Sequence, residues 1–349
     1  RRRSDGGRAG PDTVRETVGG AWCAVLEVAV SEGTKIEWCQ NTDGSPGYTF
    51  NPWRGCTKVS EACRFCYAER DRSVRLHGVK WGPTAERRVS AESTWAQPLA
   101  WDVKHRRCRT RGRVFCASLA DVFEDRPELE APRIRLLALI ALTPSLDWLL
   151  LTKRPDVMAR VMTSPDLYER VLAAANRWRS AYPRRDLSRI PVSNPADGWH
   201  NVWAGTTAEN QEQADKRIPH LLRVPARVRF LSCEPLLGPV SLPVQKTCCG
   251  AGVYPEAGGA PECCGKPDCA LPGLSWVITG GESGPGARPS HPNWFRSLRD
   301  QCAEAGVPFF FKQWGDWRPY ASQGACSDIG SGTAGGMPGF VSYPSTVKI

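Results

Sequence analysis

Long apolar stretches are missing from this chain of 349 residues. No uninterrupted apolar run approaches the roughly 18 residues that a membrane-spanning helix requires, so we expect no membrane span. The first thirty residues also lack the apolar core of a signal peptide, although AWCAVLEVAV follows from residue 21. We therefore expect a cytoplasmic protein.

Histidine is scarce, and the signatures of two common enzyme classes are absent. The chain has 5 His, none of them in an H-x-x-x-H pair, which argues against a zinc hydrolase of that type. The nearest approach to a dinucleotide-binding loop is GGESG at 280–284, which is not a G-x-G-x-x-G and comes late in the chain.

Cysteine, in contrast, is abundant and unevenly distributed. Of 15 Cys, three lie within 56–66 and five within 248–269. In a long chain without a signal peptide, clustered cysteines indicate metal binding rather than disulfides, and hence a reducing compartment.

The remaining composition is that of a folded, basic protein. With 41% hydrophobic and 23% charged residues, the chain can bury a full core as one large α/β domain or two smaller ones. A net charge of +10 attracts polyanions, so nucleic acid is one expected partner. The arginines are dispersed, however, and an ordinary basic surface explains the balance equally well.

Short apolar runs alternate with helical patterns after residue 110, which predicts βαβ units and a parallel sheet. A strand at 48–53 and a helix at 66–78 precede them. The later strands are predicted at 113–118, 146–152, 201–206, 227–235, 274–282 and 307–314, with helices at 133–142, from 152 to about 180, at 209–222 and at 293–305. These six or seven units favour a partial (β/α)6-like barrel over a doubly wound sheet.

Four departures from this alternation define the expected domain organisation. Residues 1–30 are either a flexible tail or an extension upstream of a true start at Val30, and the barrel spans 31–317. Residues 181–200 and the Cys-rich stretch 243–273 look inserted, and 318–349 forms a Gly- and Ser-rich C-terminal tail.

Polar residues follow each predicted strand, where the active site of a β/α barrel lies. Strand ends also reach water, so polarity alone does not prove function there. The catalytic candidates are Lys153, Glu234 and Glu282. The cofactor-binding candidates are Ser118, Asp121, Glu234, Gly280 and Gly281.

The segment NPWRGCTKVSEACRFCYAER carries Cys56, Cys63 and Cys66 in a C-x6-C-x2-C spacing. Three thiolates suit a [4Fe–4S] cluster with one iron left open, and the next nearby ligand type, His77, is eleven residues further on. Zinc normally takes four ligands in a structural site, so it is the second interpretation, followed by unligated core cysteines.

This arrangement resembles the radical S-adenosylmethionine superfamily, in which three cysteines follow the first strand of a partial (β/α)6 barrel. The usual spacing there is C-x3-C-x2-C, with an aromatic residue before the last cysteine, as Phe65 is here; the first gap of this chain is three residues longer. The resemblance implies a reduced cluster that cleaves S-adenosylmethionine to a 5′-deoxyadenosyl radical. It also implies an electron donor such as flavodoxin or ferredoxin.

The same resemblance implies roles for residues at the strand ends. Ser118 and Asp121 would meet the amino group of S-adenosylmethionine, and Glu234 its ribose hydroxyls. Lys153 or Arg154 would meet a carboxylate or a phosphate.

The chain is also similar to the phage-associated gene-product thirty-seven/sixty-eight family, whose function is unknown. The similarity spans nearly all of residues 34–317. It rests on IEW (36–38), NPWRGC (51–56), CRFCYAER (63–70), LTKRP (151–155), NVWAGTTAEN (201–210), EPLLGP (234–239), GGESGPGARP (280–289) and FFFKQWG (309–315).

A second cysteine cluster lies in the Gly- and Pro-rich insert. Four of its five thiols could bind Zn²⁺ tetrahedrally, and an auxiliary Fe–S cluster is the alternative. The five residues are Cys248, Cys249, Cys263, Cys264 and Cys269.

Two functions from different classes follow. The first is a radical S-adenosylmethionine enzyme that acts on a nucleic acid, a nucleotide or a peptide, with a nucleic-acid base favoured by the phage resemblance and the basic charge. The second is a zinc-stabilised nucleic-acid-binding protein without catalysis, in which some of the 14 Trp would stack on bases. Trp38, Trp53 and Trp314 flank the proposed site, whereas core packing is the ordinary interpretation of the others.

Overall fold

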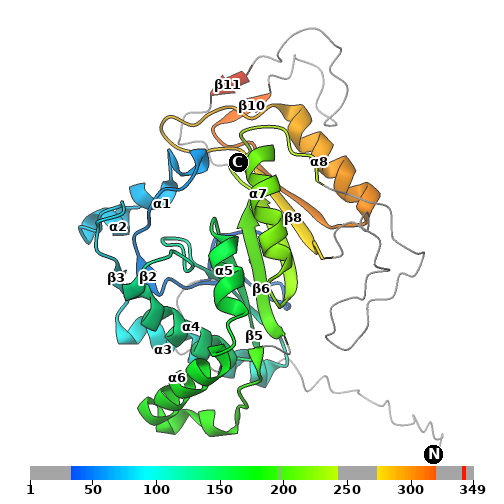
Figure 1. The fold of residues 1–349 in the computed structure, drawn as a ribbon. Helices are drawn as coiled ribbons and strands as arrows, with labels where there is room; N and C mark the ends of the chain where they lie inside the picture. Colours follow the sequence, from blue (N-terminus) through cyan, green and yellow to red (C-terminus); the bar gives the residue numbers. More distant parts are fainter. Residues whose placement is uncertain (1–32, 196–197, 243–272, 320–339, 343–349) are drawn as a thin grey trace, which may run out of the picture. The chain divides into compact units, whose positions relative to one another are not determined.

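The computed structural model describes residues 33–195, 198–242 and 273–319, together with the backbone of 340–342 (Figure 1). The predicted N-terminal extension therefore lies outside the described residues. So does nearly all of the Cys-rich insert, including its five cysteines.

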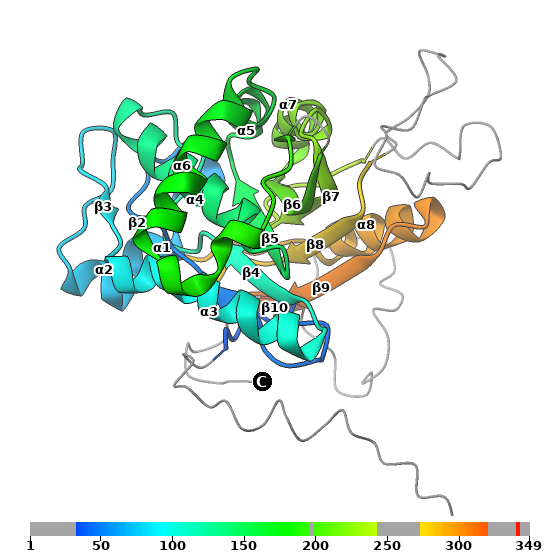
Figure 2. The ribbon, with the colours of Figure 1, turned by 90° about the horizontal axis from the view of Figure 1, so that it is seen from below.

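The central element is a sheet of seven parallel strands in the order β1-β4-β5-β6-β7-β8-β9. The sheet curls into a half-barrel with helices along its outside (Figures 1 and 2). The predicted partial (β/α) barrel is thereby confirmed. The strands are β1 (Tyr48–Thr49), β4 (Gly112–Cys116), β5 (Leu146–Thr152), β6 (Trp199–Thr207), β7 (Ala226–Cys233), β8 (Trp276–Gly280) and β9 (Phe309–Gln313).

Strands buried on both faces read as nearly continuous apolar runs, which is why LDWLLLT forms β5 with the predicted bounds. The helices connect successive strands and pack against the outer face. They are α3 (Glu92–Cys108), α4 (Glu130–Ala141), α5 (Pro155–Met162), α6 (Leu167–Ala181), α7 (Gln211–Leu222) and α8 (Pro292–Ala305). The main apolar core lies between these helices and the sheet.

A second, smaller core fills the concave side of the sheet. Phe115, Phe230 and Ile278 point inward from three strands, and Trp38 enters from the segment before β1. Gly205 permits this packing, since a Cβ there would stand 2.3 Å from the Phe230 ring. The lower part of the half-barrel is therefore filled, and open space is left near the carboxyl ends of the strands.

The region before β4 differs most from the sequence prediction. The predicted strand 48–53 divides: β1 joins the main sheet, whereas β2 (Trp53–Arg54) pairs with β3 (Arg88–Val89) in a separate ribbon. Pro52 between them has no N–H to donate to a ladder. The predicted helix 66–78 also divides, into α1 (Tyr67–Arg70) and α2 (Arg72–Leu76), because Asp71 is extended and caps α2 by accepting from Ser73 N–H.

Two further segments differ from the expectation. The predicted insertion 181–200 contains two short 3-10 turns, η3 (Pro183–Arg185) and η4 (Leu187–Arg189), and buries Leu187 and Ile190 in the main core. Within the predicted tail, β11 (Phe340–Ser342) pairs antiparallel with β10 (Trp317–Pro319).

Membrane-crossing helices were expected to be absent. In the described part of the chain, no helix combines the length and apolarity needed to span a bilayer.

Candidate functional site

A cavity of about 540 Å³ opens at the carboxyl ends of the parallel strands. This volume lies in the range of small-molecule sites. Its wall brings together most of the predicted site residues, namely Cys56, Cys63, Cys66, Ser118, Asp121, Lys153, Arg154, Glu234, Gly281 and Glu282. Among the candidates that the structure describes, Gly280 alone does not line the cavity; it lies under Glu234.

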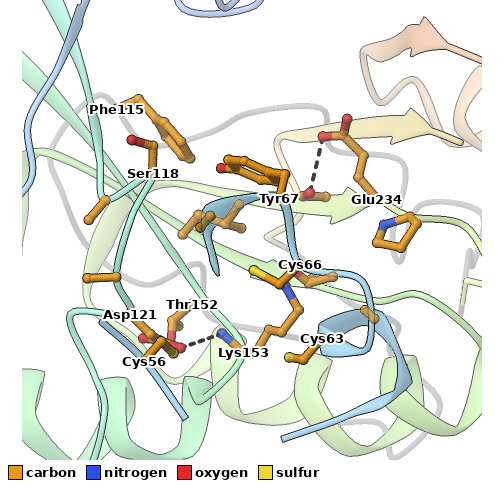
Figure 3. A pocket seen from close by; sticks show the side chains of 18 of the residues that line it. Cys56, Cys63, Cys66, Tyr67, Phe115, Ser118, Asp121, Thr152, Lys153 and Glu234 are labelled. Atoms are coloured by element: carbon orange, nitrogen blue, oxygen red, sulfur yellow. Dashed lines mark hydrogen bonds between the residues drawn. The ribbon is translucent and has the colours of Figure 1, made fainter. Parts of the chain in front are cut away.

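The three cysteines occupy the connection between β2 and α1, with Cys63 closing the short 3-10 helix η1 (Glu61–Cys63). All three are free and half-buried, and all line this one cavity (Figure 3). Thiols are the donors that Fe–S clusters use, so the chemistry of the donor set fits such a cluster. In this conformation the sulfurs do not converge: nowhere in the described ranges do three Cys, His, Asp or Glu side chains stand close enough to hold an ion.

Arg154 holds the first of these cysteines. Its guanidinium lies 3.8 Å from the Cys56 Sγ and donates to the Thr57 carbonyl at 2.8 Å and to the Asp121 carboxylate at 2.8 Å. Burial raises the pKa of the Cys56 thiol to about 12, with Asp121 adding to the effect and Arg154 opposing it. Burial opposes the charge of Arg154, but Asp121 and Cys56 outweigh it and raise the pKa of Arg154.

Hydrogen bonds to the Asp121 carboxylate connect this loop to the strand ends. Its carboxylate accepts from Thr152 Oγ1 at 2.7 Å and from the N–H groups of Phe123 and Lys153 at 3.0 and 3.1 Å, in addition to Arg154. Four donors saturate a buried carboxylate. The side chain is thus equipped to position the loop, whereas the sequence predicted that it would contact a cofactor.

A buried ion pair supports the cysteine loop at Thr57. Arg87 and Glu124 meet through two hydrogen bonds of 2.7 Å, and their side chains are only 1% and 3% exposed. Arg87 also donates to Thr57 Oγ1 at 2.8 Å. Burial alone would raise the pKa of Glu124, but hydrogen bonds from Arg87 and Thr57 hold it below its usual value.

Arg288 holds the cysteine loop at Glu61. It donates to both carboxylate oxygens of Glu282, at 2.7 and 2.8 Å, and to the Glu61 carboxylate at 3.0 Å. Its guanidinium also lies 5.3 Å from the centre of the Phe65 ring. Hydrogen bonding to Glu282 raises the pKa of Arg288. Glu282, a predicted catalytic residue, is only 5% exposed, and its carboxylate forms an ion pair with Arg288.

Glu234 projects inward from the end of β7 (Figure 3). It accepts from Ser232 Oγ at 3.2 Å and pairs with Lys312 of β9 at 3.0 Å. A Cβ on Gly280 would stand 2.8 Å from its Oε1, so glycine makes room for this carboxylate. Both partners of Glu234 line the cavity, and the predicted candidates included neither. Inward-facing positions alternate along each strand, which is the signal that could have identified them.

Lys153 and Ser118 also face the cavity. The Lys153 side chain runs up from the end of β5 toward Cys66 (Figure 3). Ser118 is held by Asn51, whose amide donates to it at 3.1 Å and whose oxygen accepts from Leu119 N–H at 2.8 Å. Lys153 therefore adds a cation, and Ser118 a hydroxyl, to the wall that carries the cysteines.

Gly280 ends β8 and Gly281 follows it, and both permit close packing. A Cβ on Gly281 would stand 1.8 Å from the Trp314 carbonyl oxygen, so only glycine fits at this point of the cavity wall. Of the tryptophans expected near the site, Trp38 lines the cavity, Trp53 is fully buried, and Trp314 packs on Phe295. Tyr67, which the sequence did not single out, lies at the cavity with 63% of its surface exposed (Figure 3).

These features define a parallel α/β half-barrel with a thiol-lined cavity at the carboxyl ends of its strands. By comparison with known proteins, the chain belongs to the family described as "Protein of unknown function (DUF5131)", whose model matches residues 33–336. No curated protein matches the chain, and no solved structure does.

Proposed function

We propose that this protein is a radical S-adenosylmethionine enzyme that holds a [4Fe–4S] cluster through Cys56, Cys63 and Cys66. The observation that carries the proposal is the shared cavity. Three free thiols from one loop line it together with Lys153 and Glu234, at the carboxyl ends of a parallel half-barrel.

The chain's own residues divide into those that bind and those that position. Lys153 would meet the carboxylate of S-adenosylmethionine, Glu234 its ribose hydroxyls and Ser118 its amino group. Arg154 and Asp121 have their hydrogen bonds within the protein, so they would fix the loop. Cys56, Cys63 and Cys66 would hold the cluster, which would supply, once reduced, the electron for cleavage of S-adenosylmethionine to methionine and a 5′-deoxyadenosyl radical.

A nucleic-acid base or nucleotide is the proposed substrate. The chain's net charge of +10 supports this choice, as does its similarity to a phage-associated family. An electron donor such as flavodoxin or ferredoxin would reduce the cluster, in a cytoplasmic setting. In the Cys-rich insert, Zn²⁺ or an auxiliary cluster would be held by cysteines outside the described residues.

The test begins with iron, sulfide and zinc analysis of protein purified without oxygen. We expect about four irons per chain from the first cluster. Replacing Cys56, Cys63 or Cys66 by Ala should remove them. Cys302→Ala is the matched control, because this free thiol is buried on α8 in the main core and should leave the iron in place.

Incubation with dithionite and S-adenosylmethionine follows, with 5′-deoxyadenosine as the measured product. Iron together with this product supports the proposal. Zinc without iron, and no cleavage, would overturn it and favour the zinc-stabilised nucleic-acid-binding protein.

A further inference from the structure

The segment from residue 54 to 91 combines two unusual surface properties. It contains nine Lys and Arg against four Asp and Glu; because Arg87 is buried against Glu124, which lies outside the segment, a net charge of +4 is left to the surface. It also holds every large apolar side chain that is exposed in the described part of the chain, namely Val59, Tyr67, Leu76 and Val89. Of these four, Val59 and Tyr67 line the cavity described above, whereas Val89 lines a separate cavity beside Trp95. Exposed apolar groups at a basic cavity wall indicate a binding partner rather than a merely solvated face.

This segment forms part of the cavity wall. It contains α1, α2 and β3, which lie together on one side of the sheet (Figure 1). Three of its aromatic residues, Phe65, Tyr67 and Trp81, line the cavity. A partner that binds the segment therefore also reaches the site.

Two charges on this surface are available to a partner. Arg72 and Arg75 on α2 are exposed, and neither guanidinium has an acceptor within the described residues. Arg64 and Arg70 lie 5.2 and 5.4 Å from the centre of the Phe65 ring, and both are exposed. Guanidinium groups that alternate with aromatic rings are typical of surfaces that bind single-stranded nucleic acid.

We propose that residues 54–91 bind a single-stranded nucleic acid. In this arrangement Arg72 and Arg75 contact phosphates, and the exposed ring of Tyr67 stacks on a base at the cavity mouth. A single strand is favoured over a duplex, because a base within a duplex must leave the stack before it can enter such a cavity. Delivery of the base to the cluster rests on the proposed function, whereas binding of the strand does not.

The test is a fluorescence anisotropy titration of labelled, mixed-sequence 15-nucleotide RNA and DNA with the full chain. The double variant Arg72→Glu/Arg75→Glu should weaken binding at least tenfold. It should also flatten the dependence of log Kd on log salt by about 1.4, as expected for two lost phosphate contacts. The matched control is Arg223→Glu/Arg227→Glu. It makes the same charge change on exposed arginines at the amino end of β7, away from the cavity, and should bind nearly as the wild type does.

Tyr67 provides a second, charge-independent measurement. Tyr67→Ala should weaken binding about fivefold or more, and Tyr67→Phe, which keeps the ring, should restore it. Equal weakening by the two double variants would show a general charge effect and overturn the proposal. Preference for a duplex, or binding of an acidic protein without binding of the strand, would overturn it as well.

The same titration on the variant with Cys56, Cys63 and Cys66 replaced by Ala separates this proposal from the proposed function. Strand binding without iron in the wild type would refute only the radical enzyme. Iron and S-adenosylmethionine cleavage without strand binding would refute only the binding surface.

Discussion

Replacement of Arg87 by Met tests how the cysteine loop is supported. Arg87 and Glu124 are almost fully buried, and their carboxylate–guanidinium contact has two hydrogen bonds of 2.7 Å. Removing Arg87 leaves the buried Glu124 carboxylate with the Arg154 guanidinium 4.0 Å away as its remaining cation, at a cost of about 3 kcal/mol, the lower end for breaking a buried pair. The variant should lose that much free energy of unfolding, measured by urea denaturation at pH 7.

Two controls isolate the buried pair. Arg160 forms an ion pair with Asp125 at the surface, where the two side chains are 62% and 63% exposed. Arg160→Met removes the same guanidinium group and should lower the free energy of unfolding by less than about 1 kcal/mol. The double variant Arg87→Met/Glu124→Leu removes the orphaned charge and should recover much of the loss.

The pH dependence gives the sign of the effect. The pKa of Glu124 is held below its ordinary value of 4.5, so its pairing stabilises the fold above that pH and is lost as pH falls through the lowered pKa. Without Arg87, burial dominates and Glu124 binds a proton more readily. The difference in free energy of unfolding between wild type and Arg87→Met should therefore be largest near pH 7 and become smaller on acidification. A loss no larger than that of Arg160→Met, or a gap independent of pH, would refute this account.

Three further predictions concern the site and its scaffold. Arg154→Gln should keep the fold but release iron to a chelator about tenfold faster, because the variant lacks the guanidinium that lies beside Cys56 and pairs with Asp121. An unchanged release rate would contradict a positioning role for Arg154. Gly281→Ala should destabilise the fold by about 2 kcal/mol or more in urea, since its Cβ would meet the Trp314 carbonyl oxygen at 1.8 Å; no loss would mean that this turn relaxes freely. Burial lowers the pKa of His105 to about 4, so stability should fall as pH is lowered from about 6.5 toward 4, and His105→Gln should flatten that slope in urea titrations at several pH values.

The strands could be predicted from sequence because burial on both faces leaves a compact apolar signature. LDWLLLT and RVFCAS show it clearly, and β5 and β4 form there. Helix α3 could not be predicted in this way. Pro98 interrupts its pattern and a basic run, Lys104 to Arg107, ends it, so the sequence shows no continuous apolar stripe. Its buried residues, Trp95 and Trp101 among them, are identified only by the surfaces they meet in the fold.

The site was partly predictable for a topological reason. Carboxyl ends of parallel strands meet at one edge, so Lys153 and Glu234 could be placed together from strand order alone. The ion pairs around the cysteine loop could not be predicted. Glu61 and Arg288 are separated by 227 residues, and only the folded chain shows that Arg288 forms hydrogen bonds with both Glu61 and Glu282. The same contacts show that Glu282, a catalytic candidate from the sequence, pairs with Arg288 at the cavity wall.

The three arginines around the cysteine loop bear on its unusual length. The gap between Cys56 and Cys63 is three residues longer than the spacing of the resembled superfamily, and a longer free loop has more conformations to lose when its ends are fixed. Here the gap is not free: Arg87 and Arg154 hold it at Thr57, and Arg288 holds it at Glu61. The stretch between these two anchors is short, and Lys58 within it pairs with Glu69 at 2.7 Å, so the longer loop has an effective length close to that of a shorter one.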